Sequence, residues 1–110
     1  MIPSSTRIFV CTERQDMRRS FDALAAVVQQ RLGEDPQDGA MFVFTNRRAN
    51  RLKVLWFDRN GYCILYKRVH RALFKLPVAG GEQTKLKIDA RTLGQILLGV
   101  AARSEARESA

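Results

Sequence analysis

The stretch from Met41 to Lys75 reads MFVFTNRRANRLKVLWFDRNGYCILYKRVHRALFK. Three short apolar runs alternate in it with clusters of arginine and lysine, and these runs are Met41–Phe44, Leu52–Phe57 and Tyr62–Tyr66. Runs of β-branched, aromatic and aliphatic residues bounded by turn formers are typical of buried strands. We therefore predict three consecutive strands with short connections.

The connection between the second and third runs is Asp58-Arg59-Asn60-Gly61. An Asn-Gly pair tolerates the two positive φ angles of a type I′ turn, so it favours a β-hairpin here. A turn centred on Asn60-Gly61 predicts the register Phe57 with Ile64, Leu55 with Tyr66 and Lys53 with Arg68. The last pair would be repulsive unless an anion relieved it, which favours an anionic ligand at that end of the hairpin.

The net charge of +8 is concentrated in the same stretch. From Thr45 to Lys75 there are nine lysines and arginines and one acid, whereas the rest of the chain has ten residues of each sign. A local excess of one sign favours a polyanionic partner, and loop arginines can present their planar groups to phosphate. The predicted nucleic-acid-binding set is Arg47, Arg48, Arg51, Lys53, Lys67, Arg68 and Arg71. The alternative is a solvated basic rim that confers only solubility.

The length and composition predict one globular domain. The chain has 110 residues, of which 45% are hydrophobic, and a pI near 10.3. This length supports one core and leaves no room for a second. We expect a single domain over residues 1–101 and a disordered tail over residues 102–110, which lack apolar periodicity.

No apolar run approaches the roughly 18–20 residues that span a bilayer. The amino terminus has neither the basic nor the apolar region of a signal peptide. The sequence therefore predicts a cytoplasmic protein with no membrane partner. In that compartment we expect Cys11 and Cys63 to be free thiols, since they lie far apart in apolar runs and fit no metal-binding spacing.

A strand and a helix are predicted before the central stretch. The strand is Arg7–Cys11, and Asp16 is a suitable N-cap for the helix that follows it. Gly33 has the usual position of a helix end. The apolar residues between them recur at helical spacing, and they are Met17, Phe21, Leu24, Ala25, Val28 and Leu32.

A second strand and helix are predicted after the central stretch. Thr84–Ile88 alternates polar and apolar residues, as an edge strand does. Asp89 would cap a helix whose apolar stripe is Leu93, Ile96, Leu97 and Val100. Short loops between consecutive strands favour antiparallel pairing. We therefore predict an α+β fold, an antiparallel sheet of five to six short strands with two amphipathic helices packed on one face.

The sequence offers no clear catalytic machinery. The one histidine, His70, lies between cations, and nothing near it in the sequence would orient its ring as a general base. The acids nearest to predicted elements, Asp16, Asp22 and Asp58, are too dispersed for a carboxylate metal site. No glycine-rich loop follows a strand to hold a nucleotide. We predict a protein that is not an enzyme and binds no cofactor or metal.

Several motifs resemble one bacterial family. They are Asp16-Met17-Arg18-Arg19-Ser20-Phe21-Asp22, the run from Phe42 to Asp58, and the run from Gly61 to Arg68. Together they resemble the product of the second open reading frame of IS66-type insertion sequences, the TnpB accessory protein. The resemblance covers roughly Met1 to Val100. It implies a small accessory protein, without catalytic residues, that assists a separate transposase.

Two positions depart from the pattern of that family. Leu76, in Phe74-Lys75-Leu76-Pro77, stands where the family usually has tryptophan. Leu98 stands where the last helix usually has glutamate, and it could widen the apolar face of that helix toward a partner.

Three functional hypotheses follow. The first is a DNA-binding accessory factor that contacts the phosphate backbone of element DNA, so that the transposase supplies sequence specificity. The second is a protein adapter that docks on the transposase through the same basic surface, extended by Leu98 and Val100. The third is an RNA-binding protein in which Tyr62 and Tyr66 stack on bases. Aromatic residues in strands more often belong to the core, which weakens the third.

Overall fold

The computed structural model describes residues 2–78 and 80–101. The predicted tail, residues 102–110, therefore lies outside the described residues. Within them the chain forms an α+β fold, as predicted, with a five-stranded sheet, a two-stranded sheet and two α-helices. No helix in the described residues is long and apolar enough to cross a membrane.

The larger sheet has the strand order β4-β3-β2-β1-β6. Its strands are β1 (Ile8–Cys11), β2 (Met41–Thr45), β3 (Arg51–Asp58), β4 (Gly61–Arg68) and β6 (Lys85–Ile88). β1 and β2 run parallel and the other neighbours are antiparallel, so the sheet is mixed and the prediction of an antiparallel sheet is wrong for this one pair. The parallel pair follows from the helix that joins its strands, because parallel neighbours need a crossover connection.

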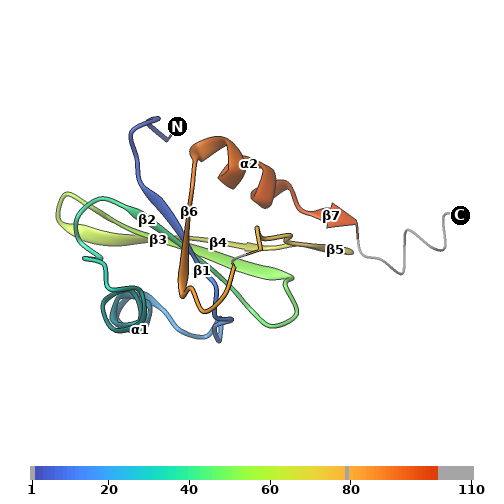
Figure 1. Cartoon of the computed structure of the whole chain (residues 1–110), viewed down its shortest axis with the longest axis horizontal. Coiled ribbons are helices and arrows are strands. Elements are labelled where there is room, and N and C mark those ends of the chain that lie inside the picture. The colour runs from blue at the N-terminus through green and yellow to red at the C-terminus, as the bar shows by residue number, and fades with distance from the viewer. Residues whose placement is uncertain (1, 79, 102–110) are drawn as a thin grey trace, which may run out of the picture.

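The two helices lie on opposite faces of the sheet, which makes the prediction of a single helical face wrong (Figure 1). Helix α1 (Phe21–Val27) continues into the π-helical turn η1 (Val28–Leu32), and both pack on Phe9, Phe42 and Phe44. Helix α2 (Ala90–Leu98) packs on the other face, against Ile8 and Val10 among others. Alternate residues of each strand point to opposite faces, so the central strands are buried on both sides.

The hairpin is present, but its predicted register is wrong by two residues. Asp58 pairs with Gly61, so Arg59 and Asn60 form the turn. Arg59 takes the positive φ angle, 56°, whereas neither Asn60 nor Gly61 does. The observed pairs are Phe57 with Tyr62, Leu55 with Ile64, Lys53 with Tyr66 and Arg51 with Arg68.

Only one of the two predicted N-caps is correct. The carboxylate of Asp89 accepts a hydrogen bond of 2.8 Å from the Thr92 backbone N–H at the start of α2. Asp16 does not cap α1, because that helix begins four residues after the predicted first residue, with Ser20 at its N-cap. Asp16 instead accepts hydrogen bonds from Arg18.

The small sheet joins the end of α2 to the segment after β4. Its strands are β5 (Ala72–Leu73) and β7 (Val100–Ala101), which pair antiparallel. Gly99 connects α2 to β7 with φ 72° and ψ 173°, a conformation that is nearly restricted to glycine. A Cβ atom there would lie 3.2 Å from the Leu73 carbonyl oxygen. The glycine thus ends the helix and lets the chain return to β5.

Candidate nucleic-acid interface

The loop between β2 and β3, residues 46–50, is held by its own side chains. The side-chain oxygen of Asn46 accepts hydrogen bonds from the backbone N–H groups of Asn50 and Arg51, at 3.1 and 3.0 Å. Its amide group donates to the Asn50 side chain at 2.7 Å. These bonds order the backbone beside Arg47 and Arg48, whose side chains are exposed.

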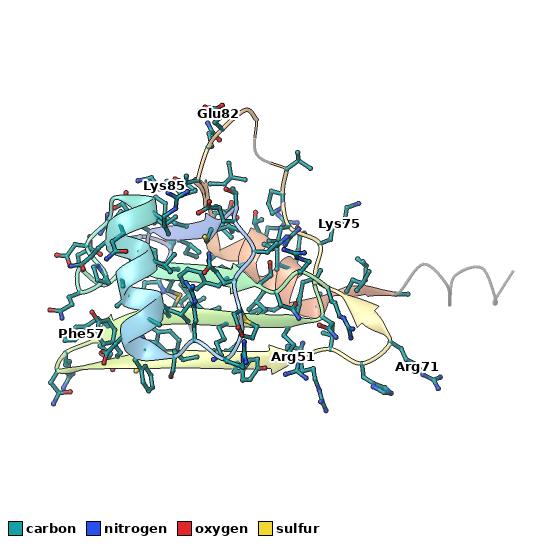
Figure 2. All side chains as sticks on the ribbon, turned by 90° about the horizontal axis from the view of Figure 1, so that it is seen from below. Arg51, Phe57, Arg71, Lys75, Glu82 and Lys85 are labelled. Atoms are coloured by element: carbon teal, nitrogen blue, oxygen red, sulfur yellow. The ribbon has the colours of Figure 1, made fainter. Side chains whose placement is uncertain are left out.

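The same loop is tied to the segment that follows β4. The Val69 N–H donates to the Asn50 carbonyl at 2.9 Å, and the Phe74 N–H donates to the Ala49 carbonyl at 2.7 Å. Two segments separated by β3 and β4 therefore meet at one end of the hairpin. Figure 2 shows Arg51 and Arg71 extending from this end, with Phe57 at the opposite end. We call this surface the basic end, and it consists of Arg47, Arg48, Arg51, Arg68 and Arg71.

The basic end contains a like-charge pair. Arg51 lies directly opposite Arg68 across the β3–β4 ladder, in place of the predicted pair of Lys53 and Arg68. The Arg51 guanidinium donates to the Tyr66 hydroxyl at 3.1 Å, which is a neutral partner. In the described part of the chain, no carboxylate pairs with Arg47, Arg48, Arg51 or Arg68. Their mutual repulsion is therefore left for solvent or an external anion to relieve.

Lys53 is buried, unlike the other residues of the predicted nucleic-acid-binding set. Only 7% of its surface is exposed. Its ammonium donates to the Arg19 carbonyl at 2.6 Å and lies 4.8 Å from the centre of the Tyr66 ring. The side chain therefore connects β3 to the segment before α1 and is not available to a ligand on the surface.

Lys67 points to the other face of the hairpin from Arg68. Its ammonium donates to the Leu97 carbonyl at 2.6 Å, at the carboxyl-terminal end of α2. A cation there is favourable, because the last carbonyls of a helix have no partner within it and carry partial negative charge. Lys67 remains exposed, so it can attract an anion while holding the end of the helix.

The structure adds a third segment to the basic end, the connection from β1 to α1, residues 12–20. The Gln15 N–H donates to the Thr45 carbonyl at 2.8 Å, and the Arg14 guanidinium donates to the Thr45 hydroxyl at 2.5 Å. This segment carries Arg14, Arg18 and Arg19, none of which is in the predicted set. The sequence conceals them because Glu13 and Asp16 cancel most of their charge in any sum along the chain.

The aromatic residues are placed mainly by packing. Tyr62 makes an edge-to-face contact with Phe57 and is partly buried against the core. Tyr66 is 49% exposed, but its ring lies next to the Lys53 ammonium and its hydroxyl accepts from Arg51. Base stacking needs a free ring face, so this arrangement does not favour an RNA-binding role for the two tyrosines.

Across the residues that the structure describes, the titratable groups show no arrangement for nucleophilic or metal chemistry. Burial raises the pKa of the Cys11 thiol, which keeps it protonated and weakly nucleophilic. His70 is exposed, on the segment after β4. Among residues 2–78 and 80–101, no three His, Cys, Asp or Glu side chains come together as a group that could hold a metal ion.

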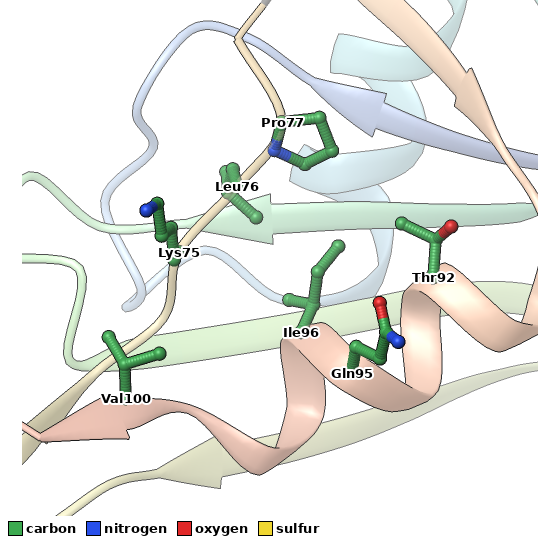
Figure 3. Close-up of a pocket in the computed structure, with 7 residues that line it drawn as sticks. All are labelled: Lys75, Leu76, Pro77, Thr92, Gln95, Ile96 and Val100. Carbon is green, nitrogen blue, oxygen red and sulfur yellow. The ribbon is translucent and has the colours of Figure 1, made fainter.

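An apolar groove of about 320 Å³ lies beside the basic end, between α2 and residues 75–77. Figure 3 shows Ile96 of α2 directed toward Leu76 and Pro77 across this groove. Val100 also lines it and is 48% exposed, and the neighbouring Leu98 is 78% exposed. This surface could bind an apolar side chain of a partner, next to the cations.

Comparison with known proteins finds a family model and similar proteins that match this chain. The family model described as "IS66 Orf2 like protein" matches residues 6–107. Uncharacterized protein y4hO of Sinorhizobium fredii (strain NBRC 101917 / NGR234) is 38% identical over 102 residues, which are 91% of this chain and 87% of that protein. Uncharacterized protein y4jC of the same organism is 35% identical over 71 residues, or 64% of this chain and 61% of that protein.

No solved structure matches the chain. The family match includes every strand and helix described above and covers the motifs on which the resemblance rests. The chain therefore belongs to the family of IS66 Orf2-like proteins, which points to a role in insertion-sequence transposition.

Proposed function

We propose that this protein is a non-catalytic accessory factor of transposition that binds the phosphate backbone of DNA through its basic end and assists a separate transposase. The observation that carries the proposal is the convergence, on one ordered surface, of arginines that have no carboxylate partner among the described residues, namely Arg47, Arg48, Arg51 and Arg68. Arginine forks suit phosphate oxygens. Contacts of this kind give affinity and orientation without reading sequence, so the transposase would choose the site.

The test compares Arg47→Gln/Arg48→Gln/Arg51→Gln with the intact chain, using fluorescence anisotropy on short duplex DNA across a range of salt concentrations. Each lost phosphate contact makes the slope of log K against log salt less steep by about 0.9. We expect the triple variant to bind more weakly and its slope to become less steep by up to about 2.7. Equal loss on element-end and random duplexes is expected, because backbone contacts carry no sequence information.

Arg59→Gln is the matched control for this experiment. Arg59 is exposed and lies in the β3–β4 turn, at the other end of the hairpin from the basic end. Its loss changes the net charge without removing a proposed contact, so affinity should fall only slightly. A triple variant that binds duplex DNA as tightly as the intact chain would exclude the proposal.

The second candidate is an adapter that docks on the transposase and does not itself bind DNA. It is favoured by the exposed apolar side chains of Leu98 and Val100 next to the basic end. Such a protein would co-purify with the transposase from nuclease-treated lysate in a salt-sensitive manner, and Leu98→Ser would reduce the yield. Measurable DNA affinity of the purified protein would instead favour the first candidate.

A further inference from the structure

A cavity of about 330 Å³ separates the segment before α1 from the loop between β2 and β3. Arginines from two distant parts of the chain, Arg14 and Arg47, both line it. The other lining residues are Gln15, Asp16, Met17 and Asn46. The cavity therefore lies at the edge of the basic end and continues its surface toward α1.

Each acid of the segment before α1, Asp16 and Glu13, forms an ion pair with one arginine. The Asp16 carboxylate accepts four hydrogen bonds from Arg18, from its backbone N–H and its guanidinium, at 2.6 to 3.1 Å. Hydrogen bonding by Arg18 lowers the pKa of Asp16 to about 2. Glu13 is paired with Arg31 through two hydrogen bonds of 2.9 and 2.7 Å.

This pairing leaves Arg14 and Arg19 without a carboxylate in the described part of the chain. The sum of charges along residues 12–20 therefore does not show which arginines lack a carboxylate partner, because Asp16 neutralises Arg18 and Glu13 neutralises Arg31. Arg14 and Arg47 remain as unneutralised cations that line the cavity, and Arg19 lies next to it, because its guanidinium is bonded to the lining residue Gln15. Three such groups at one place favour an anion.

The two arginines of the segment are held by neutral partners. The Arg14 guanidinium donates one hydrogen bond, to the hydroxyl of the fully buried Thr45. The Arg19 guanidinium donates to the Gln15 side chain at 3.1 Å, and Lys53 fixes the Arg19 backbone through its carbonyl. A guanidinium has five N–H donors, so most of them remain for a ligand while the group is already oriented.

We propose that Arg14, Arg19 and Arg47 bind adjacent phosphate groups of the DNA backbone at this cavity, with Arg14 and Arg47 lining it and Arg19 next to it. The inference rests on the proposed function and extends its interface from the hairpin to the segment before α1. The DNA then contacts two surfaces that are far apart in the sequence. Since both are tied to Thr45 and the ordered 46–50 loop, little rearrangement is needed on binding.

The test is Arg14→Gln/Arg19→Gln, assayed by anisotropy on short duplex DNA across salt. Loss of two phosphate contacts makes the slope of log K against log salt less steep by about 1.8. The matched control is Arg59→Gln/Arg91→Gln, which removes the same charge from exposed positions in the β3–β4 turn and the first turn of α2. We expect the control to keep nearly the full slope of the intact chain.

The single variant Arg19→Gln keeps the experiment decisive if loss of the Arg14–Thr45 bond disturbs the fold. It should make the slope less steep by about 0.9 and leave the urea-unfolding midpoint unchanged. If these variants match their control while Arg47→Gln/Arg48→Gln/Arg51→Gln loses affinity, the further inference is wrong and the proposed function stands. If the triple variant also binds normally, both are wrong.

Discussion

Lys53 shows how the two-sided burial of the sheet changes the role of a charged residue. In the sequence it closely follows Arg51 and the arginines of the loop, so it has the appearance of a ligand-binding cation. In the fold it shares a face with Leu55 and is covered by the segment before α1. Its ammonium satisfies a backbone carbonyl there, which is a structural role.

We expect Lys53→Met to destabilise the protein without weakening the contact with phosphate. The variant keeps the volume of the side chain but removes the hydrogen bond from the ammonium to the Arg19 carbonyl, and a hydrogen bond of a charged group contributes about 1.5–3 kcal/mol. Urea denaturation measures this loss. The salt dependence of DNA binding should keep its slope, and a slope less steep by about 0.9 would return Lys53 to the interface.

Lys75→Met is the control for that variant. Lys75 is exposed and lies at the rim of the groove beside α2. Surface substitutions of this kind usually change stability by less than about 0.5 kcal/mol, so its unfolding midpoint should match that of the intact chain.

At the scale of single elements, α2 depends on the cap at its first turn. Hydrogen bonds from the Thr92 side chain and backbone lower the pKa of Asp89 below its usual value of 3.8. The ionised carboxylate therefore favours the folded state. Its contribution is complete above the unfolded pKa and is lost as the pH falls through the lower folded value.

We expect Asp89→Ala to lower the thermal midpoint by a few degrees at neutral pH. The difference between the intact chain and this variant should shrink as the pH falls below 3.8, since protonation weakens the cap in the intact chain. Asp89→Asn is the control, because asparagine caps helices well without a charge. A difference that stays constant down to pH 2 would show that ionisation of Asp89 does not matter.

The hairpin shows which parts of an element can be predicted from sequence. The strands follow from three apolar runs, and the turn from Asp58-Arg59-Asn60-Gly61. The register does not follow, because the preference of Asn-Gly for a turn favours Asn60-Gly61, whereas the observed turn is one residue earlier, at Arg59-Asn60. The side chains that pack on Lys53 and Phe57 select the observed one, with Tyr66 and Tyr62 as their partners. A like-charge pair is still present at this end, although it is not the predicted one, because position 51 is also arginine and lies opposite Arg68.

At the scale of the whole molecule, the prediction of one covered face failed for an identifiable reason. An amphipathic stripe shows that a helix faces a sheet, but it does not say which face. The signal for two faces is in the strands. Ile8-Phe9-Val10-Cys11 is apolar at every position and buried at every position, and strands covered on both sides read as continuous apolar runs. The sequence gives no such signal for the meeting of the three basic segments, because that meeting depends on contacts between residues far apart in the chain.

A chain that ends at residue 78 tests the dependence of the sheet on its last third. It lacks β6 and α2, so β1 becomes an open edge and one face of the sheet loses its cover. Exposed apolar edges pair with other chains. We expect this fragment to aggregate, as measured by size-exclusion chromatography with light scattering, whereas a chain ending at residue 101 stays monodisperse. A monodisperse fragment with cooperative unfolding would contradict this view.

The position of β1 has a consequence for synthesis of the protein. β1 leaves the ribosome before β2, β3 and β4, whereas its neighbour β6 leaves after them, and Ile8 pairs with Ile88. Domains usually begin to fold while they are being translated, but here β1, the strand between β2 and β6, lacks one neighbour until residues 85–88 have been translated. The nascent chain therefore presents an open apolar edge at β1 until β6 has emerged, and this interval is when holdase chaperones would be needed.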